Sequence, residues 1–148
     1  MLRRTREDDI PGWLRLAAQV ESLFGAMVGV EGFEKGILAC AKNGNSFCFE
    51  GPGGGIEGVI AFDREHNSIE WLSVDRASRG KGIGAQLIGR ALEALDQSRD
   101  ITVQTFAPGV GEGLAARRLY ERFGFADRGP AGKNPAGIDT VIMARRPS

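Results

Sequence analysis

Residues 79–84 (RGKGIG) join a strand pattern to a helix pattern, and glycine occupies every second position of the junction. The preceding segment, SIEWLSVD (68–75), carries the Ile, Trp and Val that strands favour, so it predicts a strand. From residue 80 to 97 apolar side chains recur at helical spacing, which predicts one long amphipathic helix. The apolar stripe of such a helix needs a surface to cover. The junction therefore predicts a helix packed on a sheet.

The rest of the 148-residue chain shows the same two kinds of pattern. The expected helices are 10–24, 31–42, 80–97 and 114–124, and the expected strands are 1–6, 46–51, 56–64, 68–75, 101–106, 125–129 and 138–146. The order β-α-α-β-β-β-α-β-α-β-β predicts an α/β (α+β) fold with a mixed, mostly antiparallel central sheet flanked by helices. We expect a single domain over residues 1–148, because the length suits one domain and no linker or repeat interrupts it.

Composition excludes several classes of protein. Nineteen basic residues balance nineteen acidic ones, so nothing indicates a nucleic-acid partner. Cys40 and Cys48 lack CxxC spacing and no histidine cluster accompanies them, which predicts free, buried thiols and no metal site. Residues 1–9 are polar and charged, and no apolar run approaches the ~18 residues of a membrane span. We expect a cytoplasmic protein with no membrane partner.

The junction itself predicts an anion site. A helix N-terminus presents unpaired N–H groups and the positive end of the helix dipole, so it attracts phosphate groups. Gly80, Gly82 and Gly84 would let a phosphate approach the backbone, while Arg79 and Lys81 add positive charge. The G-x-G-x-G spacing matches neither a P-loop nor the G-x-G-x-x-G dinucleotide fingerprint. A flexible turn without a ligand is the alternative interpretation.

Two motifs resemble the GNAT acetyltransferase superfamily. Arg79, Gly82 and Gly84 follow L-x-V-D and fit the acetyl-CoA signature R-x-x-G-x-G. Residues 116–125, ARRLYERFGF, are similar to the later family motif A-x-x-L-Y-x-x-x-G-F, and they also lie downstream of a predicted strand. The resemblance extends along nearly the whole chain. It implies the GNAT fold, acetyl-CoA as co-substrate and an acetyl group moved to an amine.

The resemblance also implies a binding mode for acetyl-CoA. The pyrophosphate would lie on the loop and first turn of helix 80–97, and the pantetheine arm would run along strand 68–75 like an added strand. This arrangement requires strands 68–75 and 101–106 to splay apart. The predicted cofactor-binding residues are Leu72, Ser73, Val74, Arg79, Gly80, Lys81, Gly82, Ile83 and Gly84.

The resemblance places Tyr120, the only tyrosine, as the general acid for the leaving thiolate. We expect Tyr120 at the edge of a buried stripe marked by Leu119 and Phe123, where a packing role is the alternative. Glu70 is the predicted general base, because period-two alternation would place it on one strand face with Leu72 and Val74. A backbone N–H near Leu72 to Val74 would stabilise the oxyanion.

Several alternatives stay open at this point. His66 is a second candidate base, and Glu70 is otherwise a solvated carboxylate. Relatives often carry an asparagine that contacts the cofactor arm where this chain has Gly113. Either the backbone of residues 107–113 (APGVGEG) takes over this contact, or the contact is absent.

The acceptor would be an amine on a small molecule or a peptide. The resemblance places it over residues 24–36 and 129–137, where Glu21, Glu31 and Glu34 or Lys133 and Asn134 would read its charge. The competing function is a non-catalytic acyl-CoA-binding sensor or regulatory module. A homodimer is possible, as in many relatives.

Overall fold

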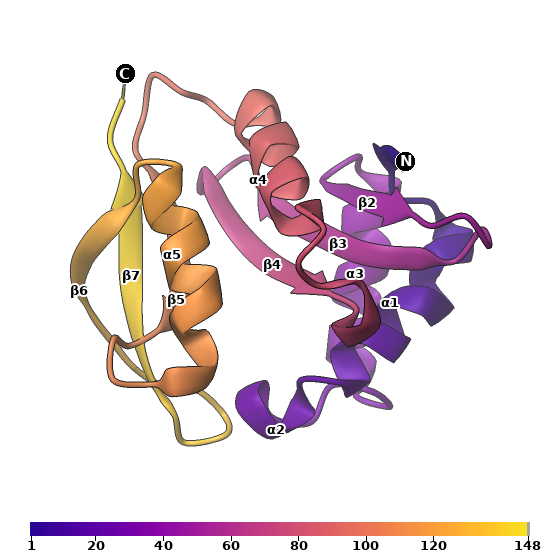
Figure 1. Cartoon of the computed structure of the whole chain (residues 1–148), viewed down its shortest axis with the longest axis horizontal. Coiled ribbons are helices and arrows are strands. Elements are labelled where there is room, and N and C mark those ends of the chain that lie inside the picture. Colours follow the sequence, from indigo (N-terminus) through magenta and orange to yellow (C-terminus); the bar gives the residue numbers. More distant parts are fainter. Residues whose placement is uncertain (148) are drawn as a thin grey trace.

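The computed structural model describes residues 1–147 and contains one mixed sheet with helices on both faces (Figure 1). Its seven strands lie in the order β1-β2-β3-β4-β5-β7-β6. The strands are β1 (Leu2–Arg4), β2 (Ser46–Glu50), β3 (Ile56–Asp63), β4 (Ser68–Val74), β5 (Ile101–Phe106), β6 (Ala126–Lys133) and β7 (Asp139–Arg145). Only β4 and β5 are parallel neighbours. The predicted mixed, mostly antiparallel sheet flanked by helices is therefore confirmed.

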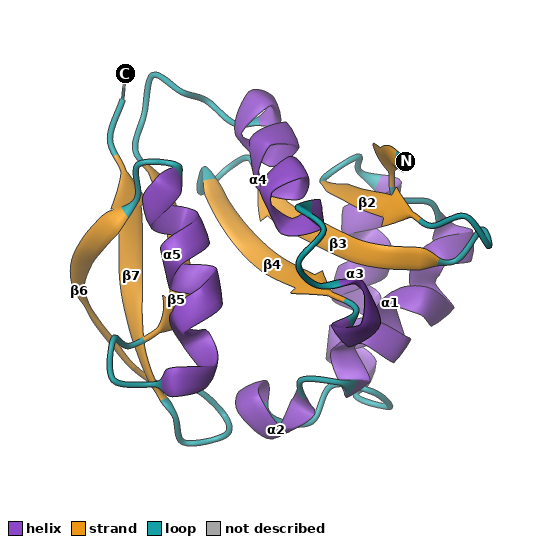
Figure 2. Cartoon of the chain, viewed as in Figure 1, coloured by secondary structure: helices purple, strands orange, loops and turns teal. Residues whose placement is uncertain are grey.

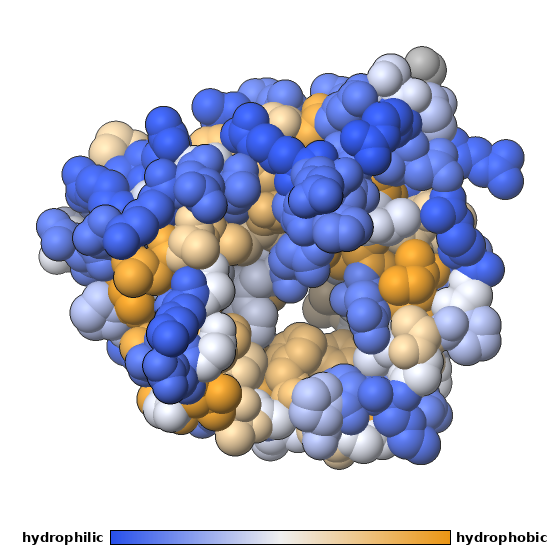
Figure 3. All heavy atoms as spheres, turned by 180° about the vertical axis from the view of Figure 1, so that it is seen from behind, coloured by the Kyte–Doolittle hydropathy of each residue, from blue (hydrophilic) through white to orange (hydrophobic). Residues whose placement is uncertain are grey.

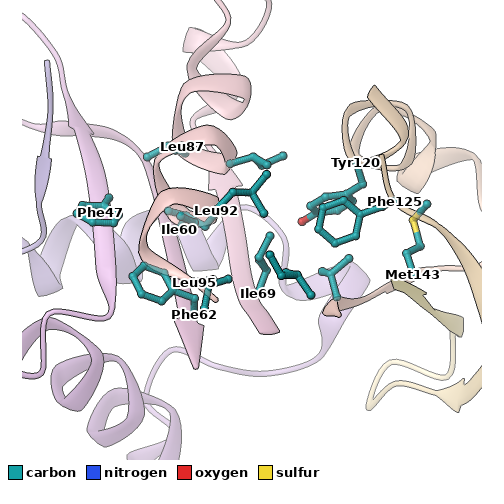
Figure 4. Packing of buried hydrophobic residues seen from close by; sticks show 14 of the residues in the cluster. Phe47, Ile60, Phe62, Ile69, Leu87, Leu92, Leu95, Tyr120, Phe125 and Met143 are labelled. Atoms are coloured by element: carbon teal, nitrogen blue, oxygen red, sulfur yellow. The ribbon is translucent and has the colours of Figure 1, made fainter. Parts of the chain in front are cut away.

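Helices cover the two faces of the sheet in separate groups (Figure 2). They are α1 (Ile10–Ala18), α2 (Glu21–Phe24), α3 (Glu31–Lys42), α4 (Ile83–Ala94) and α5 (Leu114–Arg122). One cluster of buried side chains joins α4 and α5 to the sheet, and a second joins α1 and α3 to β2 and β3. Figure 4 shows the first cluster. Within residues 1–147, none of the helices has both the length and the apolar character that crossing a bilayer requires.

The strands β4 and β5 are paired only at their beginnings and then diverge. They pair only at Ser68 with Thr102 and at Ile69 with Val103, although both strands continue well beyond these pairs. Figure 1 shows them diverging below this point, with β4 joined to β1–β3 and β5 joined to β6 and β7. The predicted splay is confirmed, and it leaves the β5-facing edge of β4 without a strand partner over most of its length.

The first predicted helix is wrong in its length, because it breaks at Gln19 and Val20. Val20 has φ −122° and ψ 12°, outside the helical region, and its buried side chain packs with Ala17 and Met27. The side chain of Gln19 instead contacts the residues after β4, where it accepts a hydrogen bond from the backbone N–H of Arg76. Tertiary contacts therefore divide one helical pattern into α1 and the short α2.

The last two strands also differ from the expected bounds. Residues 130–133 were expected in a loop, yet β6 continues through them to Lys133 with two irregularities in its pairing to β7. Proline is tolerated there because β6 is an edge strand, where a missing N–H costs no ladder hydrogen bond. The loop between the two strands is correspondingly short.

Candidate functional site

A cleft of about 370 Å³ lies where β4 separates from β5. It extends from the loop before α4, along the side of α5, to α2. Every predicted cofactor-binding residue except Lys81 lines this cleft: Leu72, Ser73, Val74, Arg79, Gly80, Gly82, Ile83 and Gly84. The space-filling view from behind shows a hollow near the centre of the molecule with hydrophobic residues along its lower rim (Figure 3). The geometry brings the predicted residues together, while their binding of a cofactor stays a prediction.

The glycine-rich loop leaves the start of α4 open. Gly80 and Gly82 have φ of +80° and +79°, and no atom lies within 4 Å of the position where either would carry a Cβ. This left-handed conformation favours glycine, which explains why α4 begins at Ile83 and not at residue 80. The first backbone hydrogen bond of the helix runs from Gln86 N to Gly82 O at 3.2 Å. The N–H groups before it are the unpaired donors of a helix N-terminus.

Gly84 has a packing role in addition to its place in the cleft. A Cβ on Gly84 would lie 2.9 Å from Cδ2 of Leu119, so the missing side chain allows α4 and α5 to approach closely. Leu119 itself lines the cleft. The third glycine of the junction therefore leaves room for Leu119 of α5 beside the start of α4.

A β-bulge in β4 changes the predicted position of Glu70. The pairing of β3 with β4 shifts register between Ala61 and Phe62, and the extra residue is Glu70. Leu72 and Val74 pack on the cluster under α4. The bulge interrupts the period-two alternation, so the prediction that Glu70 shares their face is wrong.

Glu70 lies instead on the side of β4 that faces α3. Its Oε1 accepts a hydrogen bond of 2.6 Å from the Ser68 hydroxyl, and the side chain is otherwise exposed. The pKa of the Cys40 thiol on α3 is raised first by burial and then by the negative charge of Glu70. His66, the other candidate base, is bonded to Asp63 at 2.6 Å, and this bond raises the pKa of the imidazole. Neither candidate base lines the cleft.

Tyr120 is buried and not at the edge of the helix stripe. Its side chain is 4% exposed, and its ring packs edge-on against Phe125 with 5.6 Å between centroids. Burial raises the pKa of Tyr120 well above its ordinary value. Figure 4 shows the hydroxyl pointing toward the part of the core that holds Ile69 and Leu92. It makes no hydrogen bond within residues 1–147, where α5 contributes Leu119 and not Tyr120 to the cleft lining.

An ion pair lies on the inward side of α5. Arg117 is buried one turn before Tyr120, and its guanidinium binds both carboxylate oxygens of Asp127 at 2.9 and 2.8 Å. It also donates to the backbone carbonyl of Phe106. Arg117 and Tyr120 are therefore the inward positions, and Leu119, expected at the buried face, is only half-buried.

Phe106 explains the glycine at position 113. Gly113 is buried, and a Cβ there would lie 2.5 Å from the Cβ of Phe106 and 2.7 Å from its ring. The ring of Phe106 occupies the space into which a side chain at 113 would project. Phe106 therefore leaves no room for an asparagine at position 113.

Gly113→Asn should destabilise the fold and restore no contact. Overpacking of a buried site costs about 1–3 kcal/mol, and the neighbouring Cβ of Phe106 has little freedom to move. Urea unfolding would measure the loss. Gly111→Asn is the matched control, because no atom lies within 4 Å of a Cβ at that position. Equal stability of the two variants would contradict the close packing described here.

Aromatic side chains close the end of the cleft near α2. Phe24 lies between Phe106 and Trp71, with centroid distances of 5.0 and 5.7 Å. Asn134 in the β6–β7 turn donates a hydrogen bond of 2.7 Å to the backbone carbonyl of Leu23, which fastens α2 across the gap. Sequence reasoning missed Phe24 and Phe106, because no motif marks them and they come together only through the fold.

Three of the charged residues predicted to read the acceptor make contacts within the protein, whereas Glu34 makes no side-chain hydrogen bond or ion pair within residues 1–147. Glu21 accepts the backbone N–H of Met27 at 2.6 Å and so shapes the loop after α2. Glu31 pairs with Lys35, and Lys133 with Asp139. These contacts give the residues structural roles, so they supply no choice of acceptor.

Comparison of the sequence with known protein families gives one match. The family model described as an acetyltransferase (GNAT) domain matches residues 17–146. No curated protein sequence matches the chain.

Solved structures agree with the fold. A ribosomal-protein-alanine N-acetyltransferase from Brucella melitensis superposes with a TM-score of 0.77 at 19% identity, over 99% of both chains. A diaminobutyrate acetyltransferase from Paenibacillus lautus, solved with L-2,4-diaminobutyric acid and coenzyme A, gives a TM-score of 0.78 at 17% identity, over 99% of this chain and 94% of that one. A phosphinothricin acetyltransferase from Sinorhizobium meliloti, solved with acetyl-CoA, gives 0.74 at 18%, over 100% and 88%. The family match spans most of the chain and the fold agrees with it, so this protein belongs to the GNAT acetyltransferase family.

Proposed function

We propose that this protein moves an acetyl group from acetyl-CoA to a primary amine of a small molecule or a peptide. The observation that carries the proposal is the continuous cleft from the glycine-rich start of α4 to Phe24, in a member of an acetyltransferase family. Two solved relatives of the same fold hold coenzyme A or acetyl-CoA. A single domain, a cytoplasmic location and a possible homodimer belong to the same proposal.

The chain's own groups fit the parts of acetyl-CoA. The N–H groups of Ile83, Gly84 and Ala85 precede the first hydrogen bond of α4, and they would hold the pyrophosphate with help from the charge of Arg79. The backbone of β4 beyond Ile69 has no strand on its β5 side within the described residues. Such an edge can pair with the amides of an extended arm, as an added strand would.

Bound acetyl-CoA would supply the acetyl thioester, and three groups of the protein would serve the reaction. A backbone N–H between Leu72 and Val74 would bind the oxygen on which negative charge develops. Glu70, which faces away from the cleft lining, would take a proton from the acceptor amine through water. The Tyr120 hydroxyl, which does not line the cleft in this structure, would have to reach the departing sulfur to donate a hydrogen bond to it, and its raised pKa keeps it protonated.

The competing function is an acyl-CoA sensor that binds without turnover. The presence of a tyrosine at position 120 favours the enzyme, since a sensor needs no proton donor. Release of free thiol from acetyl-CoA, measured with a mixed panel of amines, separates the two. An enzyme should release thiol when a suitable acceptor amine is present. If the protein binds acetyl-CoA but releases no thiol with any amine of the panel, it is a sensor.

Phe24→Ala should enlarge the range of acyl groups. The ring closes the cleft beyond Leu72 by packing on Phe106, so removing it opens space for a longer acyl chain. Each methylene accommodated by an apolar pocket is worth about 1–3 kcal/mol, so kcat/KM for butyryl-CoA relative to acetyl-CoA should rise at least about tenfold. Phe33→Ala is the matched control, because Phe33 contacts Trp71 without lining the cleft. An unchanged ratio would remove Phe24 from acyl selection.

Glu70→Gln should lower the rate most at low pH, where few acceptor amines are deprotonated and help from a base matters most. Acetyl-CoA affinity should stay nearly unchanged, because Glu70 does not line the cleft. A pH–rate profile and a calorimetric titration would test both expectations. Glu65→Gln, in the exposed turn before β4, is the control. If the two variants have identical profiles, water or His66 takes the proton.

A further inference from the structure

A second cavity, of about 450 Å³, lies beside the C-terminal half of α4. Three arginines line it, and they come from three parts of the chain: Arg4 in β1, Arg64 in the β3–β4 turn and Arg90 in α4. The side chains of Phe47 and Ala94 contribute apolar wall. No acidic residue lines the cavity within residues 1–147, and it shares no lining residue with the cleft.

Two of the guanidinium groups are held in place by neutral partners. Arg64 donates from Nε to Oδ1 of Asn45 at 2.9 Å and from Nη2 to the carbonyl of Gly44 at 3.3 Å. Arg90 lies over the ring of Phe47, 4.5 Å from its centroid, in a cation–π contact. Arg64 forms no ion pair within residues 1–147, so these contacts order its side chain and leave its charge unneutralised. Both groups keep further N–H donors that need acceptors.

Arg4 completes the set. Its guanidinium lies against the backbone of Gly44, where φ is +72° and any Cβ would collide with it. Within residues 1–147 the Arg4 side chain has neither a hydrogen bond nor an ion pair. The loop before β2 therefore holds Arg64 through the carbonyl of Gly44, while the missing side chain of Gly44 leaves room for the exposed guanidinium of Arg4.

The lining of this cavity is positively charged, in contrast to the chain as a whole. Of the three arginines, only Arg90 forms an ion pair within residues 1–147, with Glu93 at 3.3 Å, and that pair is exposed. Asp63 and Glu65 flank Arg64 in the sequence without pairing with it. The protein as a whole carries equal numbers of basic and acidic residues, so the cluster is no consequence of a basic composition. Like charges that share one hollow repel each other, and an anion between them would relieve the repulsion.

We propose that this cavity is a second ligand site, which binds a small molecule through a doubly charged phosphate group. The planar guanidinium fork matches phosphate oxygens with paired hydrogen bonds, and three exposed arginines line this hollow, of which Arg64 and Arg90 are ordered by their neighbours. The volume suits a small phosphorylated compound whose apolar part lies against Phe47 and Ala94. The site is independent of the proposed acetyl transfer, because it lies apart from the cleft.

Calorimetry with phenyl phosphate on the Gly82→Asp variant tests the proposal, because that background removes competition from the phosphate site expected at α4. We expect saturable, salt-sensitive binding that Arg64→Gln and Arg90→Gln each weaken by about tenfold, the effect of losing one charge-assisted contact. Arg118→Gln removes an exposed charge on α5 and should leave the affinity unchanged. Amide NMR shifts should concentrate at residues 43–47.

Three results would overturn the proposal. The first is that millimolar phenyl phosphate does not bind. The second is that the Arg64→Gln and Arg90→Gln variants bind it as tightly as the parent. The third is that the NMR shifts occur at residues 83–85 alone. A parallel sedimentation with phosphatidic acid vesicles separates a free ligand from a lipid head group. Vesicle binding without phenyl phosphate binding would overturn the small-ligand site in favour of a membrane surface. The readout is binding throughout, so a failure of the proposed acetyl transfer would leave these results unchanged.

Discussion

Gly82→Asp should weaken acetyl-CoA binding by about a hundredfold or more. The substitution places a carboxylate where the pyrophosphate is expected, and like charges brought together at a binding site cost several kcal/mol, with 1.4 kcal/mol for each factor of ten. The space around Gly82 is open, so the side chain meets no atom of the protein itself. The loss should therefore come from charge and from the φ of +79°. Isothermal titration with acetyl-CoA would measure it.

Two controls separate these causes. Gly82→Asn keeps the strain and the size without the charge, and asparagine tolerates a left-handed conformation well, so it should retain most of the affinity. Gly54→Asp adds the same charge at a second open glycine with φ +89°, in the β2–β3 turn, and should bind as the parent does. If Gly82→Asp binds acetyl-CoA normally, the loop before α4 is no part of the cofactor site.

Tyr120→Phe should lower kcat by about tenfold to a hundredfold and leave acetyl-CoA affinity little changed. Proton donation contributes about 10²–10⁴ to a rate, and the lower end applies because a thiolate leaves readily. The raised pKa of Tyr120 keeps its proton on the oxygen at neutral pH, and an ordinary thiol has a pKa of about 8.5. A hydrogen bond to the sulfur is thus favoured over complete transfer. The deficit should not vary with pH near neutrality.

Tyr120→Phe should remove the hydroxyl without disturbing the packing of the core. The hydroxyl has no hydrogen-bond partner within residues 1–147, and the ring keeps its contact with Phe125. Loss of the oxygen should therefore leave thermal stability equal or slightly higher. Steady-state kinetics with any accepted amine, together with a thermal melt, would test both expectations. A variant with full kcat would make Tyr120 a packing residue of the core.

Regular periodicity made much of the fold predictable. The bounds of α3 match the expected helix at 31–42, and the buried residues of α4 are those of its apolar stripe, because a regular helix repeats its environment every 3.6 residues. The glycine junction predicted an open helix start, since positive φ and missing side chains are properties of glycine itself. The splay of β4 and β5 came from the family resemblance, which local patterns could not supply.

Two site residues were misplaced because their positions depend on partners distant in sequence. The bulge at Glu70 arises from the pairing of β4 with β3, and it moves the carboxylate to the other face of the strand. Tyr120 lies on the same inward side of α5 as Arg117, whose ion pair with Asp127 and whose hydrogen bond to Phe106 depend on distant parts of the chain. An alternating or helical pattern contains no information about either contact.

The sequence by itself determined most of the elements, the open glycine-rich start of α4 and the family to which the chain belongs, because each depends on short-range pattern. Only the tertiary structure decided which side chains meet. Phe24 reaches Phe106 through the break between α1 and α2, and Arg4, Arg64 and Arg90 surround one cavity because β1 pairs with β2 and α4 lies across them. Contacts between residues so far apart depend on how the layers pack, and packing is a property of the whole chain.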